Sequence, residues 1–182
     1  REARYCGGIT KNLLAYTHKS EGVRKPVDLA GVLNDSLKMV EHQLRLSNIK
    51  VEKRIASDTP PVLGDANLIQ QALMNLIWNA QAAMPKGGLL RVETLTGPDG
   101  RAEIAVRDSG VGISEKNLQR IFDPFFTTKE IGKGTGLGLW VVQSILKEHK
   151  GNVGVKSQVG KGSVFTMSLP VVRGAPEMKR SA

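Results

Sequence analysis

The segment RDSGVGIS occupies residues 107–114, and GKGTGLGLW follows it at residues 132–140. The first segment sets the carboxylate of Asp108 beside Gly110 and Gly112, and glycines let a backbone approach a flat ring closely. The second segment has a glycine at every second position, directly before an apolar helical pattern. Unpaired amides at the start of a helix bind anions such as phosphates. Together the two segments predict a nucleotide site.

Strands and helices are expected on both sides of these segments. Alternating apolar and polar residues, or apolar runs bounded by turn residues, predict strands at 49–55, 89–95, 102–108, 152–159 and 163–170. Apolar residues at helical spacing predict helices at 33–46, 65–84 and 137–149. The first follows a short extended start. The second is capped by Asp65, which ends a turn predicted at 59–65. This order predicts an α+β fold, a two-layer α/β sandwich whose mixed sheet of about five strands is covered on one face by three helices.

The remaining segments set the domain boundaries. Residues 109–136 lack periodicity apart from a short helix predicted at 114–120, and so long a loop indicates a lid over the site. An apolar stripe near the N-terminus predicts a helical remnant, which we expect to pack on a part of a longer protein. The chain then divides into this remnant, a linker, the main domain and a disordered tail, at residues 1–22, 23–28, 29–171 and 172–182.

The composition, with 40% hydrophobic and 24% charged residues in 182, is typical of a soluble globular domain. No apolar run approaches the roughly 20 residues that span a bilayer, and the single cysteine, Cys6, excludes an internal disulfide. The net charge is +9, but basic and aromatic residues are not interleaved as they are in proteins that stack bases, so we expect no nucleic acid partner. The basic surface instead favours a polyphosphate ligand.

Two asparagines lie four residues apart in the second predicted helix. Asn75 and Asn79 share one helix face with small alanine side chains, which indicates the wall of an open pocket. An amide oxygen is a suitable ligand for Mg²⁺, which commonly binds the phosphates of a substrate as well. Two solvent-facing asparagines on an ordinary amphipathic helix are an equally good interpretation of these residues alone.

Two other glycine motifs do not fit this sequence. A P-loop requires Ser or Thr after its lysine, whereas Lys161 is followed by Gly162. The dinucleotide fingerprint opens a helix directly after a strand, whereas the glycines at 132–138 follow a long loop. Taken singly, each segment has an alternative interpretation. The first can be an acidic strand end followed by a flexible turn, and the second can be a glycine hinge.

Taken in order, the paired asparagines, the DxGxG at Asp108, the phenylalanine-rich segment, GxGxGxGL and the final GSVFTMSLP resemble the ATP-binding catalytic domain of sensor histidine kinases. That domain is part of the gyrase, Hsp90, histidine kinase and MutL ATPase superfamily. The resemblance covers residues 27–170, and NAQAAMP, FDPFFTTK and GTGLGLW are most similar to the nitrogen-regulatory type. Residues 1–20 resemble the end of the second helix in that family's dimerisation and phosphoacceptor hairpin.

The resemblance implies a role for each motif. Asn79 would hold Mg²⁺, and Asn75 would be a second catalytic asparagine where gyrase-type relatives carry a glutamate that activates water. Asp108 would accept a hydrogen bond from the amino group of adenine. The other implied ATP-binding residues are Gly110, Gly112, Ile113, Phe122, Thr128, Lys129, Gly134, Thr135, Gly136, Leu137, Gly138 and, on the adenine side, Ser163.

The segment FDPFFTTKE, at residues 122–130, is expected to form the body of the lid. Phe122, Pro124 and Phe125 match the aromatic patch that lies under the lid in the family. The sequence departs from the family at Ala82, where many members carry a basic residue for the phosphates. Lys129 or Lys133 would then have to supply that charge.

The family's phosphoacceptor is a histidine followed by an acidic residue. His18, His42 and His149 are followed by lysine, glutamine and lysine, so we interpret them as surface or packing residues and expect the acceptor upstream of this chain. The implied partners are the chain's own upstream dimerisation and phosphoacceptor domain, a cognate response regulator and, in the intact protein, a second copy. The implied location of this domain is the cytoplasm. The resemblance is compatible with a parent protein that is bound to a membrane.

Two other functions stay open. One is an ATPase or serine kinase of the same superfamily, against which Asn75 and the hairpin-like N-terminus argue. The other is a nucleotide-sensing or partner-binding module that keeps the fold without turnover.

Overall fold

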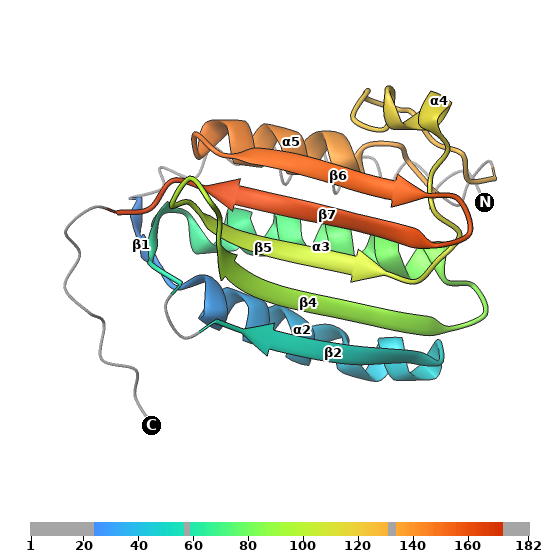
Figure 1. Cartoon of the computed structure of the whole chain (residues 1–182), viewed down its shortest axis with the longest axis horizontal. Helices are drawn as coiled ribbons and strands as arrows, with labels where there is room; N and C mark the ends of the chain where they lie inside the picture. Colours follow the sequence, from blue (N-terminus) through green and yellow to red (C-terminus); the bar gives the residue numbers. More distant parts are fainter. Residues whose placement is uncertain (1–23, 57–58, 131–133, 173–182) are drawn as a thin grey trace, which may run out of the picture.

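A computed structural model describes residues 24–56, 59–130 and 134–172 of the chain. Its centre is a mixed five-stranded sheet in the order β2-β4-β5-β7-β6 (Figure 1). Strand β2 runs parallel to β4, and every other pair of neighbours is antiparallel. The strands are β2 (Ile49–Ile55), β4 (Gly88–Thr96), β5 (Ala102–Asp108), β6 (Asn152–Gln158) and β7 (Gly162–Leu169).

Three helices cover one face of this sheet and leave the other face open, toward the viewer in Figure 1. They are α2 (Leu29–Leu46), α3 (Ala66–Ala83) and α5 (Gly138–Glu148). A short helix, α4 (Glu115–Leu118), lies in the long segment between β5 and α5. The predicted α+β two-layer sandwich is therefore confirmed, with its sheet of five strands and its three covering helices.

The hydrophobic core lies between the helices and the sheet. Strand residues that alternate along β4 and β5, such as Leu90 and Ile104, are fully buried because every second side chain points toward the helices. The core-facing stripe predicted for α3 is buried throughout, from Ile69 to Ala80. Each fully buried Leu or Ile stabilises the fold by about 1.5–3 kcal/mol relative to an exposed one.

A buried histidine joins the ends of two covering helices. The backbone N–H of Asp65, at the start of α3, donates to Nε2 of His149 at 3.0 Å. Because an amide N–H can only donate, Nε2 carries no proton, and the protonated Nδ1 donates to the carbonyl of Ile145 in α5 at 2.8 Å. His149 is 2% exposed and so belongs among the packing residues, as predicted.

A second, two-stranded sheet was not predicted. Strand β1 (Lys25–Val27) pairs with β3 (Val62–Gly64) in antiparallel orientation. Residues 25–27 of the expected linker and residues 62–64 of the expected turn are therefore strands. Strands of three residues are too short to show alternation, and the prolines in both segments are usual signs of a turn.

The start of α2 also differs from the prediction. The helix begins at Leu29 rather than at Leu33, so the expected extended start is wrong beyond Val27. The cause is Asp28, whose Oδ1 accepts a hydrogen bond from the N–H of Ala30 at 2.9 Å. This side chain satisfies one of the amides that have no partner within the helix.

Three predictions fall outside the described residues: the helical remnant at 1–22, the tail beyond residue 172, and Lys133. Among the described helices, none combines the length and the apolar character that crossing a membrane requires.

Replacing Asp28 by alanine should lower the free energy of unfolding by about 1 kcal/mol, because the Ala30 amide loses its acceptor. Urea unfolding followed by circular dichroism measures the change. The matched control is Asp35→Ala in the same helix, an exposed carboxylate 3.6 Å from Lys38, which should cost less than about 0.5 kcal/mol. Equal losses in the two variants would show that Asp28 does not cap the helix.

Candidate nucleotide-binding site

A cavity of about 530 Å³ opens between α3, the start of α5 and the long segment that joins β5 to α5. The end of β5 and the start of β7 form its floor. Residues from five parts of the chain line it: Asn75, Trp78, Asn79, Ala82, Ala83, Asp108, Val111, Gly112, Ile113, Ser114, Asn117, Ile121, Phe126, Thr127, Thr128, Lys129, Gly134, Thr135, Gly136, Gly138, Leu139, Ser163 and Phe165.

Asp108 is the last residue of β5 and is 4% exposed. Burial raises the pKa of its carboxyl group, while hydrogen bonds from the backbone amides of Gly110 and Ser163 and from the Ser163 hydroxyl act in the opposite direction. The Gly110 N–H donates to Oδ1 at 2.8 Å. Asp108 is therefore a fixed acceptor in a mostly dry position, where an added donor interacts strongly with it.

The turn after Asp108 fits closely between α3 and the turn after β6. The Val111 N–H donates to the carbonyl of Ala83 at 3.0 Å, which ties this turn to the end of α3. Gly112 has a φ of 70°, and any side chain there would collide with the carbonyl of Gln158. Only glycine fits this position without strain, so the floor beside Asp108 stays flat.

Hydroxyl groups connect the floor to the neighbouring strands. Ser157 Oγ accepts from the N–H of Ile113 at 2.8 Å, donates to the carbonyl of Gly162 at 3.0 Å, and lies 3.0 Å from Ser163 Oγ. Ser163 is paired with Asp108 in the β5–β7 register. Ser157 was not among the predicted site residues, because its place opposite Ser163 depends on the β6–β7 register.

Asn75 and Asn79 both face the cavity from α3, together with Trp78 on the same helix face. Both asparagines are half-buried and lie on a cavity wall, which favours their interpretation as site residues. A methyl group built on Gly138 would lie 3.8 Å from Asn75 Oδ1 and 3.8 Å from Asn79 Nδ2. The start of α5 thus lies directly against the two amides.

The N-terminus of α5 is open toward the cavity. No side chain among the described residues caps it, and its first turn contains no acidic residue. The first amides of a helix have no partners within the helix, and they lie at the positive end of its dipole. The preceding Gly136 has a φ of 69°, and a side chain there would collide with the backbone of Phe125. At this end of the cavity, backbone amides are therefore suited to a phosphate and can approach it closely.

Lid residues on both sides of the undescribed residues 131–133 complete the cavity. Thr127, Thr128 and Lys129 line it from one side, and Gly134 and Thr135 line it from the other. Surrounding protein lowers the pKa of the Lys129 ammonium by desolvation. Lys129 is nevertheless an exposed residue, so its charge is available to a phosphate bound in the cavity.

The three clustered phenylalanines have three different environments. Phe126 lines the cavity and carries the guanidinium of Arg120 over its ring, 4.7 Å from the centroid. Phe122 packs against the core without lining the cavity, and Phe125 is 66% exposed. The cavity wall therefore does not include Phe122, nor Gly110 and Leu137 among the other predicted residues.

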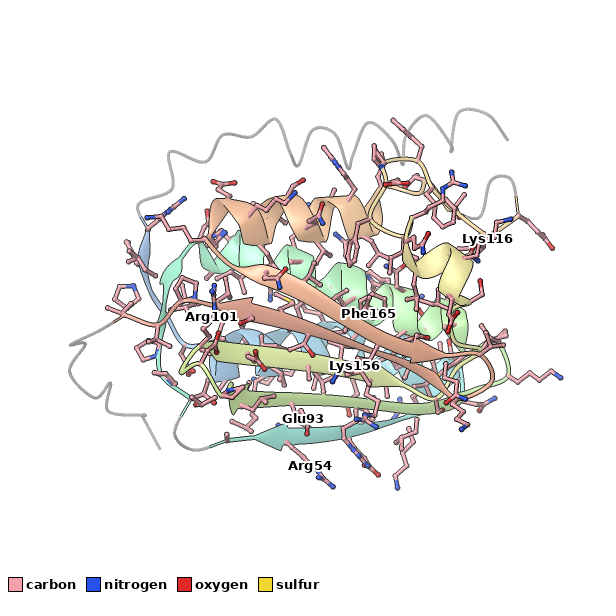
Figure 2. All side chains as sticks on the ribbon, turned by 45° about the horizontal axis from the view of Figure 1, so that its top comes forward. Arg54, Glu93, Arg101, Lys116, Lys156 and Phe165 are labelled. Atoms are coloured by element: carbon pink, nitrogen blue, oxygen red, sulfur yellow. The ribbon has the colours of Figure 1, made fainter. Side chains whose placement is uncertain are left out.

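Sequence reasoning missed several lining residues. Trp78 lies three residues after Asn75 and therefore on the same helix face, and Phe165 lies two residues after Ser163 and therefore on the same strand face. Figure 2 shows Phe165 on β7. Both spacings are visible in the sequence and could have indicated these two residues. Asn117 and Phe126, in contrast, line the cavity only because of the irregular path of the lid.

The donor set is suitable for a magnesium ion. Asn79 offers a neutral amide oxygen, and Mg²⁺ takes oxygen ligands and keeps waters or substrate phosphates in its other positions. The uncapped start of α5 lies beside this amide, so an ion held by Asn79 would be near any phosphate bound there.

Comparisons with known proteins agree with this arrangement. The model of the family of histidine kinase-, DNA gyrase B-, and HSP90-like ATPases matches residues 64–173. Sporulation kinase C of Bacillus subtilis is 43% identical over 144 residues, which cover 76% of this chain and 33% of that protein. Sensor histidine kinase ZraS of Escherichia coli is 36% identical over 171 residues, 94% of this chain and 36% of that protein. The chain spans between 19% and 36% of the length of these and the other leading curated relatives.

Solved structures share the fold. The nucleotide-free catalytic domain of histidine kinase ThkA superposes with a TM-score of 0.71 at 29% identity, over 80% of this chain and 96% of that domain. Full-length ShkA in complex with AMPPNP gives a TM-score of 0.76 at 27% identity, over 87% of this chain and 33% of that protein. The chain therefore belongs to the family of histidine kinase-, DNA gyrase B-, and HSP90-like ATPases, and its named relatives within that family are sensor and sporulation kinases.

Proposed function

We propose that this chain is the ATP-binding catalytic domain of a sensor histidine kinase, which binds Mg²⁺-ATP and presents the γ-phosphate to a histidine on an upstream helix. One observation carries the proposal: a single cavity has a buried carboxylate, Asp108, on its floor and uncapped helix amides at the start of α5. A purine with an amino group fits the first feature, and a chain of phosphates fits the second.

The two ends of the cavity have different roles. Asp108 accepts a hydrogen bond from the adenine amino group, and Gly112 leaves room for the ring above the floor. The amides around Gly136 and Gly138 hold the phosphates, together with the ammonium group of Lys129. Lys129 thus supplies the charge that is missing at Ala82, which also lines the cavity.

Asn79 is the proposed magnesium ligand. When bound, the ion neutralises charge that develops on the phosphates during transfer. Asn75, one turn earlier, has an amide that cannot take a proton from water at neutral pH. A site with Asn75 in place of a carboxylate holds ATP without activating water beside it, which favours transfer to another side chain over hydrolysis.

The remaining parts of the proposal concern the intact protein. The acceptor histidine lies on an upstream dimerisation and phosphoacceptor domain, to which we assign residues 1–22 as a C-terminal part. Residues 23–28 connect it to the catalytic domain at 29–171. The phosphate then passes to a response regulator, and the intact protein is a dimer with this domain in the cytoplasm. The names of the relatives, which are sensor and sporulation kinases, support this role.

Replacing Asp108 by asparagine should weaken ATP binding at least about tenfold, since a hydrogen bond to a charged group contributes about 1.5–3 kcal/mol. It should also remove the preference for ATP over GTP, because guanine has no amino group at the corresponding ring position. Calorimetry measures both affinities, and the fluorescence of Trp78, which lines the cavity, gives an independent signal. The control is Asp99→Asn in the exposed β4–β5 turn. An unchanged ATP affinity in Asp108→Asn would falsify the nucleotide assignment.

The raised pKa of Asp108 predicts two opposite pH effects. For the free protein, the contribution of this group to stability is present below its unfolded-state pKa, about 3.9, and is lost as pH rises through its folded-state pKa. For the complex, the ionised carboxylate is required, so ATP affinity should fall as pH drops through that raised pKa. Titrating the affinity from about pH 8 to about pH 5 measures the second effect. If Asp108→Asn shows the same fall, another group causes it.

Replacing Asn79 by alanine in the intact protein should reduce formation of acid-labile phosphohistidine by about a hundredfold, because the metal supplies most of the charge neutralisation. Binding of magnesium-free ATP should change less than about threefold. Asn67→Ala, an exposed amide on the same helix, is the control. Acid-stable phosphoserine as the product would support a serine kinase instead, and tight binding without any transfer would support a sensing module.

A further inference from the structure

A second cavity of about 530 Å³ lies on the open face of the sheet, on the side away from the helices. Four basic residues from three strands and a turn surround it: Arg91 in β4, Arg107 in β5, Lys156 in β6 and Lys161 in the β6–β7 turn. We call it the basic hollow. Its lining also includes the side chains of Leu89 and Val164.

The strand register aligns the basic residues. Arg91 lies directly opposite Arg107, Arg107 opposite Val164, and Val164 opposite Lys156. Residues in such a row project to the same face of a sheet. Because neighbouring strands are about 4.8 Å apart, the row from β4 to β6 is about 14 Å long.

Within the described residues, most of this positive charge is not neutralised. Like charges directly opposite one another destabilise a sheet, so the pair of Arg91 and Arg107 has a cost. Glu52 on β2 offsets part of it, since its Oε2 accepts from Arg91 Nη2 at 2.8 Å and from Nε at 3.1 Å. Arg107, Lys156 and Lys161 form no ion pair with any carboxylate in the described parts of the chain.

The rest of the open face is different. One row further along, Arg54 lies opposite Glu93, and in the next row Glu103 lies opposite Leu95. Arg54, Glu93 and Lys156 are labelled in Figure 2, on β2, β4 and β6. Acidic residues thus accompany the basic ones outside the hollow, and unbalanced positive charge is concentrated within it.

Glu52 shows that this face favours carboxylates. Its hydrogen bond with Arg91 lowers the pKa of its carboxyl group, and the charges of Arg91, Lys50 and Arg54 add to that effect. An external carboxylate placed beside Arg107 and Lys156 would enter the same positive field.

We propose that the basic hollow is a docking surface for an acidic segment of a partner protein. In an extended segment, carboxylates at every second position are about 6.6 Å apart, so three of them match a row about 14 Å long. A single phosphate group is too small to reach all four basic side chains. The apolar side chains of Leu89 and Val164 provide contacts that a polyphosphate could not use, whereas a peptide with an apolar residue could.

Two copies of the chain meeting face to face do not fit the hollow. Two copies meeting at this face would bring the same arginines and lysines together, and the whole chain carries a net charge of +9. The occupant is therefore a different, acidic protein or domain.

The surface is independent of the proposed nucleotide site, although Asp108 and Ser163 lie at the boundary between the two cavities. None of the four basic residues lines the nucleotide cavity. A failure of the docking proposal would therefore leave ATP binding unaffected, and a loss of ATP binding in Asp108→Asn would leave docking unaffected.

The test uses a fluorescein-labelled peptide in which glutamate alternates with leucine and serine, titrated with the full chain at physiological salt. The double variant Arg107→Glu/Lys156→Glu should bind it about tenfold more weakly or worse, since charge complementarity at this surface is reversed. The matched control, Lys38→Glu/Arg45→Glu, makes the same change in net charge on the exposed side of α2 and should bind as the wild type does. ATP affinity should be the same in all three proteins, which shows that the variants fold.

A second pair of measurements identifies the occupant and the location. Amide chemical shifts on adding the peptide should change around Leu89, Arg107 and Lys156. Tripolyphosphate and a single-stranded oligonucleotide should compete only weakly. Equal peptide binding by both double variants, shifts confined to α2 or the lid, or tighter hollow-dependent binding of either phosphate polymer would each overturn the proposal. The charge-keeping variant Arg107→Lys/Lys156→Arg should retain peptide binding, and its loss would contradict an electrostatic surface.

Discussion

A carboxylate is costly to remove from water, and the fold places that of Asp108 at the end of a central strand with almost no exposure. Its hydrogen bonds set conditions on the surrounding chain. The turn after β5 has to bring the Gly110 amide back to Oδ1, and the β5–β7 register has to place Ser163 opposite. The same turn then reaches the end of α3 through Val111 and Ala83. The floor of the nucleotide cavity is therefore a consequence of how one buried charge is satisfied.

Regular periodicity made much of this fold predictable from the sequence. In α3, one stripe of apolar residues indicated the core-facing side, and the asparagines on another face indicated the cavity wall. In β5, alternation correctly placed Asp108 at the strand end. The order of these motifs along the chain then carried the resemblance to the family, because each motif alone had an ordinary alternative interpretation. Where local pattern and function coincided, the sequence was sufficient.

Other features depend on contacts between distant segments and could not be predicted. The pairing of β1 with β3 joins two three-residue strands whose prolines indicate turns. Three phenylalanines within five residues gave no sign that Phe126 would face the cavity while Phe125 would face solvent. The basic hollow is the clearest case, since its residues are spread from Arg91 to Lys161 and become a row only through the register of four strands.

The buried imidazole of His149 has a mechanical consequence. Its hydrogen bonds join Asp65, the residue before α3, to the last turn of α5. Asn79 and the open amides of α5 lie toward the opposite ends of these two helices. The hydrogen bonds of His149 thus join the two helices at the ends away from the cavity, and they add to the direct packing of α3 against α5. Room for a larger nucleotide would then come from a shift of the lid and its phenylalanines. The distance between Asp108 and the start of α5 would stay the same.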